Sequence, residues 1–266
     1  SEMDQTSSAG QERTGETEIM KDYRIHVEEL MDPLYRHGCR VFSVVGSGGK
    51  TTLIRQAAMH YARLYQVGVA ASTKMCLPDG QWEYKGCPPA VVSSDGQGDA
   101  KRQAAPICFY TEHILPSGKI WDLGEQMLGQ ALEESDLLLI EADGSNRKPL
   151  KGWREDEPVI LPATEATIGV LPMHCLGEII DATKVHRMEK FTAITGLEPG
   201  DVMTEEAYLQ LITAENGLFG HSLGSRWLVL NRVNDPQLYQ SAKKIAEAAV
   251  TSGVIDGWIA GCLENE

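Results

Sequence analysis

The chain has 266 residues, of which 42% are hydrophobic and 23% charged, a balance typical of a globular protein. Its formal net charge of -14 repels nucleic-acid phosphate and anionic lipid, so we expect neither a nucleic acid nor a membrane as partner. No apolar run approaches the roughly 20 residues that span a bilayer, and no secretory signal is visible. With no zinc-type cysteine spacing, these features favour a cytoplasmic protein with reduced thiols.

Polar composition predicts a disordered tail at residues 1–18, followed by a single domain at 19–266. After a short helix predicted at 23–34, the apolar run 40–46 ends in glycine and predicts a buried strand. Apolar residues on one face predict a helix at 51–65, and 67–73 predicts a second strand. A strand, a glycine loop, a helix and a strand in this order indicate a βαβ unit and a parallel sheet.

Further along the chain, prolines, glycines and short β-rich pieces predict a β-rich, hairpin-like insertion at about 76–118. Apolar spacing predicts a helical segment at about 177–224. Other strands are predicted at 136–145, 167–171, 226–233 and 254–261, and other helices at 123–134 and 235–253. The alternation predicts an α/β fold with a P-loop NTPase-like core, a parallel sheet with helices on both faces.

The glycine-rich stretch 46–52 follows a predicted strand and opens a helix, as a phosphate-binding loop does. Glycine lets backbone N–H groups approach phosphate oxygens, because no Cβ blocks the way. The common loop would need a glycine at position 44, where Val44 stands, but Mur-type peptide ligases use a shorter loop, G-[TS]-x-G-K-[ST]-[TS], that this stretch fits. The predicted nucleotide-binding residues of the loop are Gly46, Ser47, Gly48, Gly49, Lys50, Thr51 and Thr52.

Two acids close the apolar strand predicted at 136–145, and strand alternation puts Glu141 and Asp143 on the same side. A phosphate loop needs an acid at such a strand end to hold or order Mg²⁺. We therefore predict Thr51, Glu141 and Asp143 as the metal site and Lys50, Glu141 and Asp143 as the catalytic side chains. Which acid binds the metal and which polarises a water stays open.

Several other polar residues are candidates for the same site. Arg147, Lys148 and Lys151 follow the acids and either clamp an anion or balance the acids at 155–157. Thr73 and Lys74 end the second strand at the edge where α/β sheets bind ligands, or they cap it.

The stretch 229–235 is similar to the Asn-Lys-x-Asp guanine reader of GTPases, with Asn231 in the first position. Asn234 stands where that motif has an acid, and an amide only partly replaces a carboxylate toward guanine. The motif therefore does not establish GTP, and Asn231 is predicted only to lie near a base. We expect ATP, or GTP, together with Mg²⁺.

These motifs together resemble the selenium-dependent hydroxylase accessory proteins, the YqeC-like family. The matching pieces are 44–52, 71–75, 141–151 with Glu157-Pro158, His186-Arg187 and 230–234. Two departures from the family pattern are Ala71-Ser72 in place of threonines and Asn234 in place of an acid.

The resemblance implies a nucleotide-dependent accessory factor, with a molybdenum hydroxylase or its cofactor as partner. The residues by themselves indicate a Mg²⁺-dependent P-loop NTPase that favours ATP. Two alternatives remain: an ATP-dependent ligase or kinase with a Mur-like loop, or a nucleotide-gated binding protein with little turnover.

Overall fold

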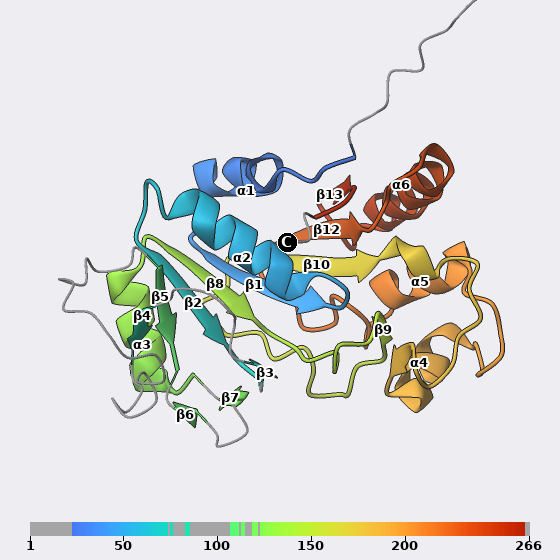
Figure 1. The fold of residues 1–266 in the computed structure, drawn as a ribbon, viewed down its shortest axis with the longest axis horizontal. Helices are drawn as coiled ribbons and strands as arrows, with labels where there is room; N and C mark the ends of the chain where they lie inside the picture. The colour runs from blue at the N-terminus through green and yellow to red at the C-terminus, as the bar shows by residue number, and fades with distance from the viewer. Residues whose placement is uncertain are drawn as a thin grey trace, which may run out of the picture.

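The computed structural model describes residues 23–73, 107–111 and 123–263, together with the backbone of short strands at 75–76, 83–85, 113–114 and 119–121. The tail predicted at 1–18 lies outside the described residues. Figure 1 shows one layer of strands running through the molecule with helices on either side. The predicted α/β class, with a parallel sheet flanked by helices, is confirmed.

The central sheet has eight strands in the order β13-β12-β10-β1-β8-β2-β5-β4, and all neighbours run parallel. The strands are β1 (Val41–Gly46), β2 (Val67–Ala71), β4 (Glu83–Lys85), β5 (Ile107–Tyr110), β8 (Leu137–Glu141), β10 (Ala166–Pro172), β12 (Ser225–Asn231) and β13 (Gly257–Ala260). After β1 the chain builds one side of the sheet and then crosses to the other. This reversal of strand order marks the edge where open α/β sheets bind ligands.

The segment predicted as a β-rich insertion differs from the prediction in one respect. Its strands β4 and β5 belong to the central sheet, where Val67 of β2 pairs with Ile107 of β5 in parallel. The hairpin-like part is the small antiparallel sheet of β3 (Met75–Cys76), β6 (His113–Ile114) and β7 (Lys119–Trp121). A parallel strand as short as β5 is not distinguished from a hairpin strand by its apolar pattern alone.

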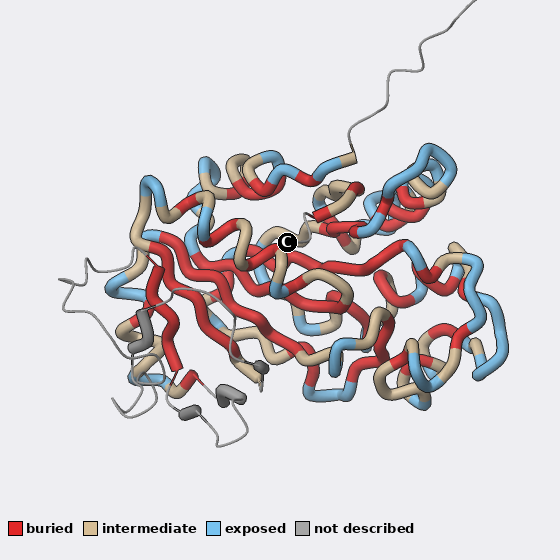
Figure 2. Tube along the Cα trace, in the orientation of Figure 1, coloured by how far each residue is buried: buried red, intermediate tan, exposed pale blue. Residues whose placement is uncertain are grey.

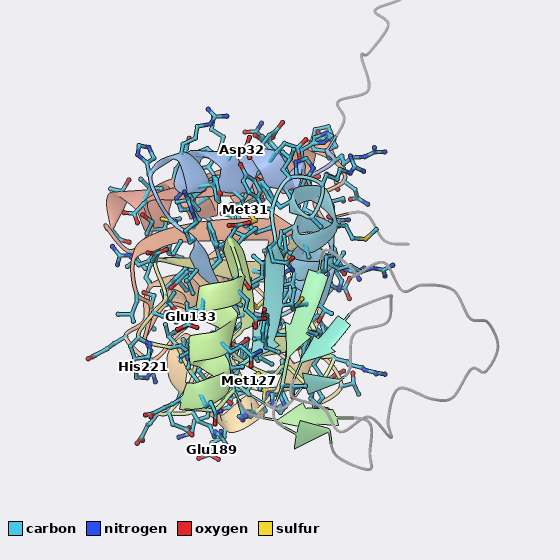
Figure 3. The ribbon with its side chains drawn as sticks, turned by 90° about the vertical axis from the view of Figure 1, so that its left-hand side faces the viewer. Met31, Asp32, Met127, Glu133, Glu189 and His221 are labelled. Atoms are coloured by element: carbon cyan, nitrogen blue, oxygen red, sulfur yellow. The ribbon has the colours of Figure 1, made fainter. Side chains whose placement is uncertain are left out.

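Two apolar layers enclose the sheet, and Figure 2 shows the strands buried between helices that are exposed on their outer sides. On one face, α1 (Val27–Arg36) and α2 (Lys50–Tyr61) cover Phe42 and Val44 of β1. On the other face, Val45 packs with α5 and α6, while α3 covers β5 and β8. Figure 3 shows α3 in front of the sheet, marked by Met127 and Glu133. The bounds are α3 (Glu125–Glu134), α4 (Met188–Thr195), α5 (Glu205–Thr213) and α6 (Pro236–Thr251).

The segment predicted as helical at 177–224 contains α4 and α5, and also the strand β11 (Val185–His186). This strand pairs in parallel with β9 (Leu150–Lys151), so that His186 lies beside Lys151. A 3-10 turn, η2 (Met173–Cys175), follows β10. The pairing ties the loop after β8 to the start of α4.

No helix among the described residues is long and apolar enough to cross a membrane. The described cysteines, Cys39, Cys108, Cys175 and Cys262, carry free thiols.

Candidate functional site

The glycine loop connects β1 to α2 in the middle of the sheet. Gly46 has φ +101° and Gly49 φ +146°, values that L-residues rarely adopt. A Cβ on Gly46 would lie 2.1 Å from the Val170 carbonyl oxygen, and one on Gly49 would lie 2.5 Å from Asn231 Nδ2. Both conformation and space therefore require glycine at these two positions.

Some backbone N–H groups of the loop bond within the protein, and others belong to the first turn of α2. The Ser47 N–H donates to the Val170 carbonyl at 2.9 Å, and the Gly46 N–H donates to Asp143. The first helical bond runs from the Leu53 N–H to the Gly49 carbonyl at 2.9 Å. The N–H groups of the first turn of α2 lie outside this ladder, an arrangement that suits an anion.

Lys50 folds back under the loop and is only 4% exposed. Its ammonium donates to the Gly46 carbonyl at 2.7 Å. It also lies 3.4 Å from Asp143 Oδ1 and 3.8 Å from Glu141 Oε1. The predicted lysine and the two predicted acids thus meet directly beneath the loop.

The two acids have different partners. Glu141, at the end of β8, accepts a hydrogen bond from the Thr51 hydroxyl at 3.1 Å. Asp143 is fully buried and accepts from the Gly46 N–H with both oxygens at 3.0 Å and from Trp153 Nε1 at 2.8 Å. The Lys151 ammonium also donates to Asp143 Oδ2 at 3.0 Å. These bonds connect Asp143 to the backbone of the loop, and its place among the metal ligands stays a prediction.

Their environments also push the pKa values of the two acids in opposite directions. Burial raises the pKa of Glu141 despite the opposing effects of the Lys50 ammonium and the Thr51 hydroxyl. Burial acts on Asp143 as well, but two lysines and the backbone N–H outweigh it and lower its pKa. The environments of the two acids thus favour a proton on Glu141 over one on Asp143.

The three predicted cations after the acids lie in different environments. The Lys151 ammonium is fully buried and contacts Asp143, the Gly144 carbonyl at 2.6 Å and Glu157 at 3.4 Å, which occupies all three donors. Lys148 donates to the carbonyls of Ala182 and Val185. Arg147 is exposed in a left-handed turn with φ 59°. Lys151 thus pairs with an acid of the segment 155–157, the alternative that the sequence left open, and the phosphate clamp stays a prediction for Arg147.

Asn231, predicted to lie near a base, bonds to the backbone of the glycine loop. Its side-chain amide donates to the Gly48 carbonyl at 2.7 Å and accepts from the backbone N–H groups of Arg232 and Leu263. Ser47 is likewise buried, with its hydroxyl donating to the Pro149 carbonyl at 2.7 Å. Both side chains fix the shape of the loop.

Thr73 follows β2 at the carboxyl edge of the sheet, where β2 neighbours β8. Its hydroxyl oxygen is buried and has no hydrogen-bond partner in the described part of the chain. Lys74 lies outside the described residues. Thr52 is half-buried in the first turn of α2.

Oxygen atoms of this edge suit a hard divalent cation. Thr51 and Glu141 place a hydroxyl and a carboxylate 3.1 Å apart, and the hydroxyl of Thr73, without a partner among the described residues, is a third oxygen at the same edge of the sheet. Within 23–73, 107–111 and 123–263, no three His, Cys, Asp or Glu side chains gather into a metal cluster. Mg²⁺ fits this pattern, because it commonly takes one or two protein ligands and keeps water and phosphate oxygens for the rest.

Two buried residues that the sequence analysis did not assign also belong to this site. Trp153 donates to Asp143, and Glu157 pairs with Lys151 and with Arg187. Glu157 belongs to the Glu157-Pro158 piece that matches the YqeC-like family, and this match is the only sequence feature that indicated it. Trp153 gave no signal, because a buried tryptophan normally indicates core packing.

Fold and loop together define an α/β protein whose central parallel sheet carries a glycine loop and two acids at its ligand-binding edge. Residues 42–189 match the family model described as YqeC protein. The chain is also 32% identical over 184 residues to the Uncharacterized protein YqeC of Escherichia coli (strain K12), covering 67% of this chain and 70% of the relative. No solved structure matches the chain. The chain belongs to the YqeC family.

Proposed function

We propose that this protein binds a nucleoside triphosphate with Mg²⁺ at the loop 46–52 and hydrolyses it. The observation that carries the proposal is the convergence of Lys50, Thr51 and Glu141 beneath a glycine loop at the start of α2. Phosphate and its metal are commonly bound where a lysine, a hydroxyl and a strand-end acid surround the N–H groups at the start of a helix.

Each side chain has a distinct task in this proposal. The N–H groups of the first turn of α2 bind the phosphate oxygens, and the Lys50 ammonium neutralises their charge. Thr51 and Glu141 hold Mg²⁺, which when bound withdraws charge from the phosphate oxygens.

We propose ATP over GTP as the nucleotide. The guanine reader of GTPases needs a carboxylate where this chain has Asn234, and Asn231 already uses its amide to hold the loop. The further role of an accessory protein in maturation, with a molybdenum hydroxylase or its cofactor as partner, rests on the family resemblance alone.

A thermal-shift panel of ATP, GTP and CTP, each with Mg²⁺ or with EDTA, tests binding, because a ligand stabilises the folded state by mass action. We expect the largest shift with ATP and Mg²⁺ and a smaller shift in EDTA. No shift with any nucleotide would contradict the proposal.

Phosphate release measured on the same samples separates hydrolysis from other uses of the nucleotide. Steady release with ATP alone supports an NTPase. Binding without release would instead indicate a nucleotide-gated binding protein, and release that requires a cosubstrate would indicate a ligase or kinase.

A further inference from the structure

Four side chains of alternating charge connect the glycine loop to the start of α4. Asp143, which holds the Gly46 N–H, lies 3.0 Å from the Lys151 ammonium. Lys151 lies 3.4 Å from Glu157 Oε2. Glu157 in turn accepts from both terminal nitrogens of Arg187, at 2.9 Å for the Nη2–Oε1 bond. We call Asp143, Lys151, Glu157 and Arg187 the buried charge chain.

Burial makes the order of charges in this chain matter. The side chains of Asp143 and Lys151 are 0% exposed, that of Glu157 4% and that of Arg187 23%. Two anions and two cations alternate, so the chain is neutral as a whole and each interior charge has an opposite charge on either side. Removing one member leaves an uncompensated charge in a region with little water.

Arg187 occupies a fixed position at the far end of this chain. It precedes the first residue of α4 and adopts a left-handed conformation with φ 57°. The preceding residue, His186, pairs with Lys151 across the β9–β11 ribbon. The backbone of Arg187 is therefore held between two elements, β11 and α4, and the two bonds from its guanidinium orient the Glu157 carboxylate.

Lys151 is shared between two carboxylates, Asp143 on the loop side and Glu157 on the α4 side. While Arg187 neutralises Glu157, the Lys151 ammonium lies closer to the Asp143 carboxylate than to the Glu157 carboxylate. Without Arg187, the unneutralised Glu157 would draw the Lys151 ammonium away from Asp143. Asp143 would then lose a partner that fixes its two oxygens on the Gly46 N–H.

We infer that Arg187 and Glu157 are positioning residues for the glycine loop, acting through Lys151 and Asp143. The consequence for nucleotide affinity rests on the proposed function, whereas the consequence for loop order does not. The pair joins the loop to α4, so the start of α4 and the phosphate loop form one electrostatic unit.

The test is amide hydrogen exchange of the loop peptide 43–52 in the full-length, nucleotide-free protein. Arg187→Met is compared with Arg154→Met, a matched control, because Arg154 also lies 3.4 Å from Glu157 but is 53% exposed. We expect about tenfold faster loop exchange in Arg187→Met, since weakened local bonds open more often, and less than about a twofold change in Arg154→Met. A peptide from α6, which contains no residue of the buried charge chain, reports global unfolding.

A double variant separates positioning from general loss of structure. Glu157→Gln in the Arg187→Met background removes the charge that draws Lys151 away, so loop exchange should slow toward the wild-type rate. Arg187→Lys keeps the charge without the two-pronged geometry and should give an intermediate rate; it replaces Arg187→Met in the comparison if that variant does not fold.

Three results would overturn the inference: unchanged loop exchange in the Arg187 variants, no rescue by Glu157→Gln, or equal acceleration in the α6 peptide. Affinity for ATP with Mg²⁺ is then measured in the same variants and should fall about tenfold in Arg187→Met and less than about twofold in Arg154→Met. If the wild type binds no nucleotide, the proposed function fails, and the exchange comparison still decides whether Arg187 positions the loop.

Discussion

Replacing Lys50 with methionine should destabilise the nucleotide-free protein, quite apart from any effect on binding. The substitution keeps an unbranched side chain without the terminal ammonium, and so removes a charge that lies 3.4 Å from Asp143 and 3.8 Å from Glu141. Opposite charges about 4 Å apart attract by about 4 kcal/mol at an effective dielectric constant near 20. Much of this attraction offsets desolvation, so the expected loss of unfolding free energy is about 3–5 kcal/mol, the usual cost of stranding a buried charge.

Glu141→Gln in the same background should recover part of this loss, because it removes one of the two stranded carboxylates. Urea unfolding of the wild type, both single variants and the double variant at pH 7 gives the coupling between the two residues, expected to be about 1–3 kcal/mol. Additive losses, or a Lys50→Met variant as stable as the wild type, would refute the reasoning.

The same series has a predicted pH dependence. A carboxyl whose pKa is raised on folding favours the folded state at low pH, and this contribution is lost as the pH rises through the folded-state pKa. Burial raises the pKa of Glu141 and Lys50 opposes this, so removing Lys50 raises it further. The deficit of Lys50→Met should therefore be smaller at pH 5 than at pH 7, provided that Glu141 is present.

Two further predictions concern loop geometry and a titrating histidine. Gly46→Ala places a Cβ 2.1 Å from the Val170 carbonyl oxygen at φ +101°, so urea unfolding should show a loss of at least about 2 kcal/mol in the free energy of unfolding. Gly129→Ala, in open space within α3, should raise the free energy of unfolding by about 0.5–1 kcal/mol. Burial, with help from neighbouring cations, lowers the pKa of His186 to about 4 from 6.5, so its contribution to stability is complete above pH 6.5 and lost as the pH falls toward 4. Because His186 is half-exposed, we expect this loss to be about 1 kcal/mol, and it should be absent in His186→Gln.

Most of the sheet could be predicted because its strands are unbroken apolar runs. Strands β1, β8 and β10 are buried on both faces, and such strands carry no polar alternation that could suggest another structure. The place of β5 could not be read in this way. Four apolar residues between loops fit either a hairpin or a parallel sheet, and only the pairing with β2 decides between them.

The core of the site could also be predicted, since Lys50, Glu141 and Asp143 follow strands that end at the same edge. The roles of individual polar groups could not. Lys151 and Asn231 have the side chains of ligand-binding residues, but Lys151 bonds two acids on the loops around it and Asn231 bonds Gly48, which is distant in sequence. Bonding of this kind depends on tertiary contacts, which a residue type and a spacing do not specify.

The affinity for ATP with Mg²⁺, measured by titration calorimetry on the wild type, Lys50→Ala and Lys148→Ala, tests the central claim most directly. Lys148 is a matched control because its ammonium bonds the carbonyls of Ala182 and Val185 and not the loop. A charge-assisted contact to phosphate contributes about 1.5–3 kcal/mol, so Lys50→Ala should lose at least about tenfold in affinity. Lys148→Ala should bind as the wild type does, whereas equal affinity in all three proteins would contradict a phosphate site at this loop.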